Sequence, residues 1–253
     1  MVPHSKHKPV LLNEVLRFLD PKPGFRYVDA TVGLGGHAVA ILKMIEPNGF
    51  LYGVDQDGDA IEWCRNRFSQ YENKFQLLHC RFAELGERIS PDSCDGVLMD
   101  LGVSSPQLDR GERGFSFMRD GPLDMRMDQN RNLTAEDLIR DMRLDQLLTI
   151  LRQYGEEPKA LRLARAIVKQ RQITPFTSTG QLADFISQTI PSRNRKIHAA
   201  TKAFQALRIA VNEELETLEN GLKICFGLLK KGGRLGVITF HSLEARIVKR
   251  FGV

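Results

Sequence analysis

The fold of this chain is decided by the stretch Tyr27-Val28-Asp29-Ala30-Thr31-Val32-Gly33-Leu34-Gly35-Gly36-His37. Its first residues favour a β-strand, and its glycines permit positive φ angles and a close approach of a ligand to the backbone. The apolar pattern from Ala38 to Met44 then predicts a helix. A helix that begins behind a glycine turn presents free N–H groups to an anionic or polar ligand. The stretch therefore predicts a strand, a binding loop and a helix.

A second strand is predicted over Gly49 to Val54, and it ends at Asp55. This acid lies about twenty residues beyond the glycines, where an acid can bind a ribose diol in a nucleotide-binding βαβ unit. The glycine spacing is not the G-x-G-x-x-G of dinucleotide sites, and Asp29 precedes the glycines. The pattern resembles the first motif of S-adenosylmethionine-dependent methyltransferases with a Rossmann-like fold. A glycine-rich turn in another α/β protein is the alternative.

Two further strands are predicted over Phe75–His79 and over residues 95–100, which end at Asp100. Phe82 follows the third strand, where it can lie against an adenine ring or pack in the core. Amino-methyltransferases hold their target amine at an acid in the position of Asp100, usually followed by two prolines and an aromatic residue. Here Leu-Gly-Val-Ser-Ser-Pro follows the acid, so the sequence does not supply that aromatic partner for the target base.

The composition favours an ordinary globular protein with an anionic partner. The chain has 253 residues, 42% of them hydrophobic, and a net charge of +5. Its basic N-terminus has no apolar region behind it, and no apolar run approaches the roughly 18 residues of a membrane span. We therefore expect a cytoplasmic protein without membrane contact. Neither the cysteines nor the histidines show ligand spacing, so we expect reduced core thiols and no metal site.

The middle of the chain predicts a helical insertion. Residues 109–131, termed here the charged loop, hold five acids and five arginines, which predicts an ordered loop held by ion pairs. Helical patterns without strands follow, and between Lys159 and Arg208 ten basic residues accompany one acid. The predicted fold class is α/β, a Rossmann-like methyltransferase sheet with an inserted all-helical domain. Its core comprises residues 1–106 and 199–253, and the inserted substrate-recognition domain comprises residues 107–198.

Several blocks together resemble one family over nearly the whole chain. They are His7–Leu12, Asp29–His37, Met99–Asp109, Arg113–Asp128, Tyr154–Glu157, Thr201–Glu214 and Phe240–Glu244. With these blocks the chain resembles the bacterial-type 16S ribosomal RNA cytosine-N4 methyltransferases. The resemblance implies S-adenosylmethionine as cofactor and a decoding-region cytidine of small-subunit ribosomal RNA, or the small ribosomal subunit, as partner. Family members usually continue past the position of Val253 with a last strand and a basic tail.

The resemblance also implies the residues of the site. The cofactor contacts carry over to Gly35, Gly36, His37, Asp55, Phe82, Asp100 and Gln107. Asp100 is the candidate catalytic residue, because an acceptor of an N4–H hydrogen bond would disperse the charge that develops on the amine. It can instead only hold the cofactor. His241 can line the substrate mouth or be a turn histidine, and Phe115 and Phe117 can support the base or pack in the core.

Two rival functions use the same residues. A nucleotide-binding oxidoreductase would use the same βαβ unit, but the glycine spacing and the loop after Asp100 argue against it. A non-catalytic ribosome-assembly factor would bind RNA and keep the methyltransferase fold as a relic. The intact set of glycines and acids argues against that alternative. The sequence does not define an oligomeric state.

Overall fold

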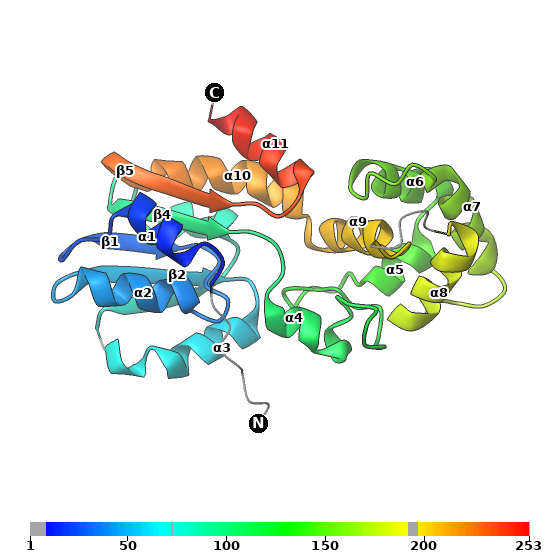
Figure 1. Cartoon of the computed structure of the whole chain (residues 1–253), viewed down its shortest axis with the longest axis horizontal. Coiled ribbons are helices and arrows are strands. Elements are labelled where there is room, and N and C mark those ends of the chain that lie inside the picture. Colours follow the sequence, from blue (N-terminus) through cyan, green and yellow to red (C-terminus); the bar gives the residue numbers. More distant parts are fainter. Residues whose placement is uncertain (1–8, 72, 192–196, 253) are drawn as a thin grey trace. The chain divides into compact units, whose positions relative to one another are not determined.

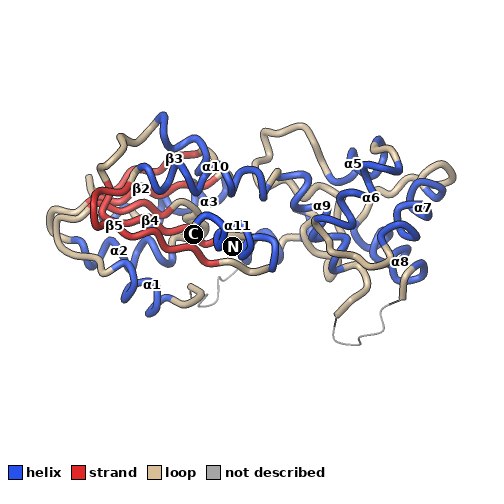
Figure 2. Tube along the Cα trace, turned by 90° about the horizontal axis from the view of Figure 1, so that it is seen from above, coloured by secondary structure: helices blue, strands red, loops and turns tan. Residues whose placement is uncertain are grey.

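The computed structural model describes residues 9–71, 73–191 and 197–252. The chain forms two compact units (Figure 1). The first comprises the chain up to Gly102 and from Leu215 onward, and the second comprises Val103–Glu214. All named strands lie in the first unit, whereas the described part of the second consists of helices and loops (Figure 2). Within the described residues, none of the helices has the length and apolar character needed to cross a bilayer.

The first unit is built on one parallel sheet. Its strands are β1 (Arg26–Asp29), β2 (Phe50–Asp55), β3 (Phe75–His79), β4 (Cys94–Asp100) and β5 (Leu229–Ile238). They are arranged in the order β3-β2-β1-β4-β5, and every neighbouring pair is parallel. The strand order reverses between β1 and β4, which makes this position the topological switch point of a doubly wound sheet. The predicted α/β class with a Rossmann-like sheet is confirmed.

Helices cover both faces of this sheet (Figure 1). They are α1 (Leu12–Leu19), α2 (Gly36–Ile45), α3 (Gly58–Arg67), α10 (Glu214–Gly227) and α11 (Ser242–Phe251). The apolar residues of α1, α2 and α3 form one core cluster with Leu98 of β4, and those of α10 and α11 form another with Val97 and Met99. Neighbouring residues of β4 therefore enter opposite cores, as the alternation of side chains along a strand requires.

β5 begins earlier than its sequence predicts. The Lys-Lys-Gly-Gly sequence of residues 230–233 predicts a turn, with a strand only from Arg234, but β5 already begins at Leu229. Cys94 pairs with Leu229 and Gly96 with Arg234, so β5 holds three more residues than β4 between these pairs. The surplus is taken up by an irregularity in which Gly232 has a φ of 86°. A bulge of this kind lets the strand resume its pairing after a local turn.

The second unit is helical. Its helices are α4 (Ser105–Asp109), α5 (Ala135–Asp141), α6 (Leu144–Gln153), α7 (Ala160–Gln170), α8 (Thr179–Thr189) and α9 (Thr201–Asn212). The unit begins at Val103, before the predicted boundary at Gln107, and extends past His198 because α9 belongs to it. Ala203, Phe204 and Leu207 of α9 are buried in the same core cluster as α5 to α8. The apolar face of α9 is thus covered by the inserted helices.

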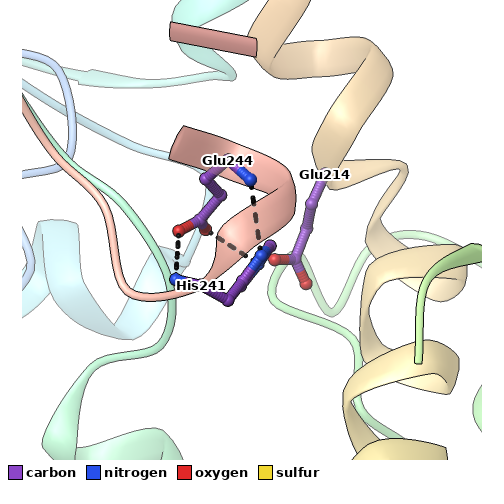
Figure 3. Close-up of side chains that lie close together, drawn as sticks. All are labelled: Glu214, His241 and Glu244. Carbon is purple, nitrogen blue, oxygen red and sulfur yellow. Dashed lines mark hydrogen bonds and ion pairs between the residues drawn. The ribbon is translucent and has the colours of Figure 1, made fainter. Parts of the chain in front are cut away.

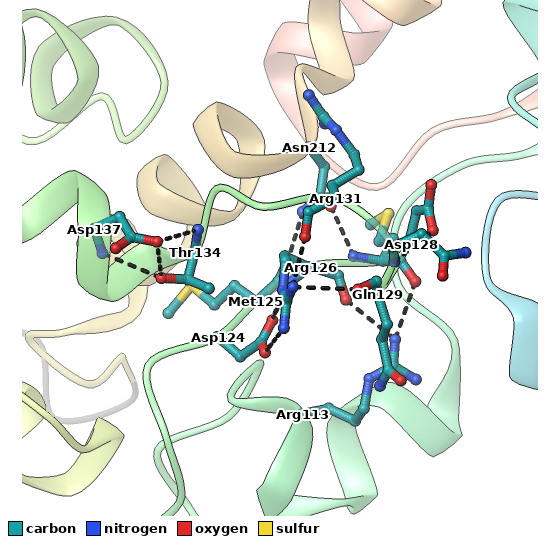
Figure 4. A network of polar contacts seen from close by, with 12 residues as sticks. Arg113, Asp124, Met125, Arg126, Asp128, Gln129, Arg131, Thr134, Asp137 and Asn212 are labelled. Carbon is teal, nitrogen blue, oxygen red and sulfur yellow. Dashed lines mark hydrogen bonds and ion pairs between the residues drawn. The ribbon is translucent and has the colours of Figure 1, made fainter.

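The charged loop is ordered by side chains that bind its own backbone (Figure 4). Arg126 forms a bidentate salt bridge with Asp124, with hydrogen bonds of 2.8 and 2.6 Å. The buried Arg113 donates to the carbonyls of Arg126 and Met127 at 3.1 Å each. Asn212 of α9 accepts the N–H of Met127 at 2.8 Å. The Arg126–Asp124 pair is an ion pair of the expected kind. The guanidinium of Arg113 and the amide of Asn212 add hydrogen bonds to the main chain of the loop.

Candidate active site

The carboxyl edge of the sheet brings three acids to one place. Asp29, Asp55 and Asp100 are the last residues of β1, β2 and β4. Since these strands are parallel neighbours, their final residues lie at the same edge, on both sides of the switch point. Ligands of open α/β sheets bind in the crevice outside this position. The structure therefore places three polar side chains where such a fold binds its ligand.

The glycine loop is tied to β2 by Asp55. Gly33 and Gly35 have φ angles of 49° and 73°, in the left-handed region that glycine adopts without strain. The N–H of Gly33 donates to Oδ2 of Asp55 at 2.9 Å, and the N–H of Asp57 donates to Oδ1 at 2.9 Å. Burial raises the pKa of Asp55 to about 6, although these hydrogen bonds oppose the shift. Asp55 thus supports the loop as well as facing the carboxyl edge.

Gly35 and Gly36 are predicted contact residues at which an added side chain would run into other parts of the protein. A Cβ atom added at Gly35 would lie 2.7 Å from the ring of Phe68 in the turn after α3. One added at Gly36 would overlap the ring of Pro9. These glycines allow the loop to pack closely against its neighbours. Their contact with a cofactor through backbone groups stays a prediction.

His37 lies between two of the acids. It is the second residue of α2 and is only 6% exposed. Its Nε2 atom is 3.6 Å from Oδ2 of Asp100. Asp29 is buried, and burial raises its pKa to about 7, with His37 opposing the shift and the charge of Asp100 adding to it. The N–H of Asp100 donates to the hydroxyl of Thr31 at 2.7 Å, which fixes the end of β4 to the loop after β1.

Some polar atoms of this cluster make no hydrogen bond within the described residues. Both ring nitrogens of His37 and Oδ1 of Asp100 are buried without a hydrogen bond. Buried polar atoms in folded proteins are nearly always hydrogen-bonded, and exceptions call for an explanation. A ligand with hydrogen-bonding groups at the switch point would satisfy them. The cluster therefore fits a polar cofactor or substrate better than it fits a purely structural role.

Two other predicted contact residues make local contacts. The ring of Phe82 packs against Gly221 of α10, so the core-packing interpretation describes at least part of its role. Gln107 is buried in the second unit, where its Oε1 atom accepts the N–H of Ser104 at 2.9 Å in the capping box of α4. Contacts of either residue with a cofactor stay predictions.

His241 is the N-cap of α11, which agrees with its interpretation as a turn histidine. Its Nδ1 atom accepts the N–H of Glu244 at 3.4 Å, and its Nε2 atom lies 3.2 Å from Oε1 of Glu244 (Figure 3).

Phe115 is buried in the core of the second unit, where Phe117 stacks on His198 at 4.5 Å. Thr31 was not among the predicted site residues, although a hydroxyl residue just after a strand end is a signal of a ligand-facing position.

The sheet order, the glycine loop and the acid-lined carboxyl edge define a Rossmann-like α/β protein with a ligand site at its switch point. Within this class the chain belongs to the MraW methylase family, whose match covers residues 4–252. The predicted cofactor, S-adenosylmethionine, agrees with membership in a methylase family. The resemblance expected from the sequence blocks is confirmed at the level of the family.

Its relatives share a name. "Ribosomal RNA small subunit methyltransferase H" of Trichlorobacter lovleyi is 48% identical over 248 residues, which are 96% of this chain and 79% of the relative. The protein of the same name from Geobacter sulfurreducens is 49% identical, over 96% of this chain and 80% of the relative. That of Legionella pneumophila is 45% identical, over 98% and 81%.

Proposed function

We propose that this protein methylates the exocyclic N4 amine of a cytidine in the decoding region of small-subunit ribosomal RNA, with S-adenosylmethionine as methyl donor. The names of its relatives support the RNA substrate. The observation that carries the chemistry is the acid at the end of β4. Asp100 lies beside the switch point and holds a buried carboxylate oxygen without a hydrogen bond. That oxygen is suited to accept an amine hydrogen.

The donor would be held along the carboxyl ends of β1 and β2. The loop from Gly33 to His37 offers the first N–H groups of α2, and Asp55 faces the same edge. When bound, S-adenosylmethionine supplies an electrophilic methyl group on a positively charged sulfur. The ring nitrogens of His37 make no hydrogen bond to the described residues, and with the carboxylate of Asp100 they offer hydrogen bonds to the polar groups of such a ligand.

Asp100 would orient and activate the amine. The N4 nitrogen of cytosine is a poor nucleophile because its lone pair is delocalised into the ring. A carboxylate that accepts one N4–H hydrogen bond draws the nitrogen toward tetrahedral geometry and stabilises the positive charge that develops on it. Oδ1 of Asp100 can take the proton as the amine becomes cationic. Thr31 holds the backbone of Asp100 in place, which limits the movement of the residue that carries this carboxylate.

The competing proposal is a non-catalytic assembly factor. It would bind ribosomal RNA and require neither an amine acceptor nor a methyl donor. The buried unpaired atoms of His37 and Asp100 favour the enzyme, because a relic site gains nothing by leaving them unsatisfied. An enzyme of this kind acts on ribosomal particles, which fits the proposed cytoplasmic location. The second unit would then recognise the RNA.

Transfer of labelled methyl from S-adenosylmethionine to small ribosomal subunits tests the proposal. Nucleosides from the product RNA are identified by mass spectrometry, and we expect N4-methylcytidine. RNA binding without methylation would favour the assembly factor, and label at another atom would refute the N4 assignment.

The role of Asp100 is tested in the same assay. Asp100→Ala should lower the rate at least a hundredfold, as loss of a preorganised charge-stabilising group commonly does. Asp100→Asn keeps an acceptor oxygen and should retain more activity. Asp184→Ala, which removes an exposed acid of α8, is the matched control and should behave as wild type. Wild-type turnover of Asp100→Ala would rule out both of its proposed roles.

A further inference from the structure

The aromatic ring of Phe240 lies next to the loop that follows Asp100. Asp100 pairs with Ile238 at the end of β5, and Phe240 comes two residues later. A Cβ atom added at Gly102 would lie 3.4 Å from Cδ2 of Phe240, so the ring rests against the backbone at Gly102. Gly102 has a φ of 90° and carries no side chain that could separate the ring from the loop. The ring thus lies against the loop two residues beyond the acid to which we assign the amine.

Phe240 is exposed although its backbone is held firmly. Its side chain is 56% exposed, so part of the ring is accessible to a ligand. Glu244 is only 3% exposed, and its Oε2 atom accepts the N–H of Phe240 at 2.8 Å and that of His241 at 3.3 Å. Figure 3 shows Glu244 turned back toward the segment that precedes α11. The backbone that carries the ring is therefore held in place before any ligand arrives.

We propose that the exposed face of Phe240 stacks on the target base and holds its amine at Asp100. This inference rests on the proposed function. The segment from Leu101 to Pro106 contains no aromatic residue that could stack on the base. Phe115 is buried in the core of the second unit, and Phe117 already stacks on His198 and packs edge-on against Phe204. Phe240 would supply the missing aromatic surface from another strand end.

Phe240 and Asp100 would each recognise a different feature of the target base. Stacking on an aromatic ring stabilises any base, because every base has a π-face, and so it does not select cytosine. The acceptor at Asp100 selects bases that present an exocyclic amine. The base must leave its stack in the RNA to reach this site, and an exposed ring replaces part of the stacking that it loses. Phe240 would therefore affect capture of the RNA substrate rather than binding of the methyl donor.

Kinetics with small ribosomal subunits test this division. Phe240→Ala should lower kcat/KM for the RNA roughly ten- to a hundredfold, the range found for loss of one base–aromatic stack. Phe240→Tyr keeps the ring and should stay near wild type. The affinity for S-adenosylhomocysteine, measured by calorimetry, and the melting temperature should change little in both. The matched control is Phe226→Ala, which removes a ring that is 60% exposed and packs edge-on against Phe251.

Fluorescence gives a readout that a structural role would not produce. In the double variant Trp63→Phe/Phe240→Trp the new indole is the only one in the chain. Cytidine added with S-adenosylhomocysteine should quench it, whereas the Trp63→Phe/Phe226→Trp variant should show no such change. Absence of quenching together with wild-type kinetics of Phe240→Ala would overturn the inference. If wild-type protein forms N4-methylcytidine in that case, the proposed function stands and only the stacking fails. If it forms none, the proposed function has failed first.

Discussion

Asp29 is the most deeply buried of the three acids at the carboxyl edge, with an exposed fraction of 1%. Burial raises its pKa to about 7, whereas the Thr31 N–H at 3.4 Å offers only a weak hydrogen bond against this shift. A carboxyl whose pKa is higher in the folded protein than in the unfolded chain favours folding below its unfolded pKa. That contribution is lost as the pH rises through the folded pKa.

Asp29→Asn should therefore stabilise the protein at neutral pH. The amide does not ionise, so the variant avoids the cost of a buried charge. Near pH 4 the two proteins should have similar free energies of unfolding. As the pH rises from 4 to about 7, the variant should become increasingly more stable than wild type. The gain is limited to about 4 kcal/mol, because one pKa unit corresponds to about 1.4 kcal/mol. Urea unfolding across this pH range measures it. A difference that does not vary with pH would show that Asp29 does not titrate there.

The start of α2 shows how a glycine can serve packing more than ligand approach. Gly35 is the N-cap of α2 at a φ of 73°, and its missing Cβ faces Phe68. Gly33 also has a positive φ, of 49°, but a Cβ there would meet only the carbonyl of Thr31, at 3.9 Å. The two positions therefore share the backbone requirement and differ in the space available.

Gly35→Ala should destabilise the protein more than Gly33→Ala. Both alanines adopt a left-handed conformation at a cost of about 1–2 kcal/mol. At Gly35 the added methyl group also crowds Phe68, and overpacking typically adds about 1–3 kcal/mol. Urea unfolding of both variants, without ligand, gives the difference. Equal losses at the two positions would contradict the packing role. A weaker cofactor affinity of Gly35→Ala has to be interpreted together with its lower stability.

Strands and their terminal acids were accessible from sequence because local patterns encode them. Phe75–His79 forms β3 as predicted, and Asp55 and Asp100 end their strands. Parallel pairing then brings the strand ends together without further information. The contact of Thr31 with Asp100 was not accessible, since it joins loops 69 residues apart in sequence. Such a contact depends on the final packing of β1 against β4.

Helix faces were predicted less well than helix positions. The helical spacing in α7 predicts that Leu161, Ala164 and Val168 turn inward. Ala164 is buried and Val168 packs against the core, whereas Leu161 is exposed and Leu163 and Ile167 are buried in addition. A large aromatic residue in a helix likewise predicts a core position, but Trp63 of α3 is exposed. An amphipathic pattern fixes a helix face to within about one residue, and the neighbouring elements decide which side is covered. The assignment of α9 to the second unit depends on neighbours in the same way.

Some of the basic side chains between Lys159 and Arg208 are already held by contacts within the second unit. Ten basic residues lie between Lys159 and Arg208, and three of them, Arg193, Arg195 and Lys196, lie outside the described residues. Several others are engaged: Arg208 pairs with Glu214, while Lys159, Arg171 and Lys202 donate to backbone carbonyls. Arg162, Arg165 and Lys169 form an exposed stripe along α7, and they make no ion pair with the rest of the described chain. This stripe is the candidate phosphate-binding surface of the unit.

Arg162→Glu/Arg165→Glu should weaken binding of ribosomal RNA regardless of sequence. Each phosphate contact releases counterions, so each lost contact should reduce the slope of log affinity against log salt by roughly one unit or slightly less. Cofactor affinity and melting temperature should change little, since exposed charges contribute little to folding. The control Arg88→Glu/Lys223→Glu makes the same change of net charge on exposed residues of the first unit. Titrations at several salt concentrations measure both slopes. If only the control variant loses slope and affinity, the phosphates bind the first unit instead, and Arg246–Arg250 of α11 becomes the next segment to test.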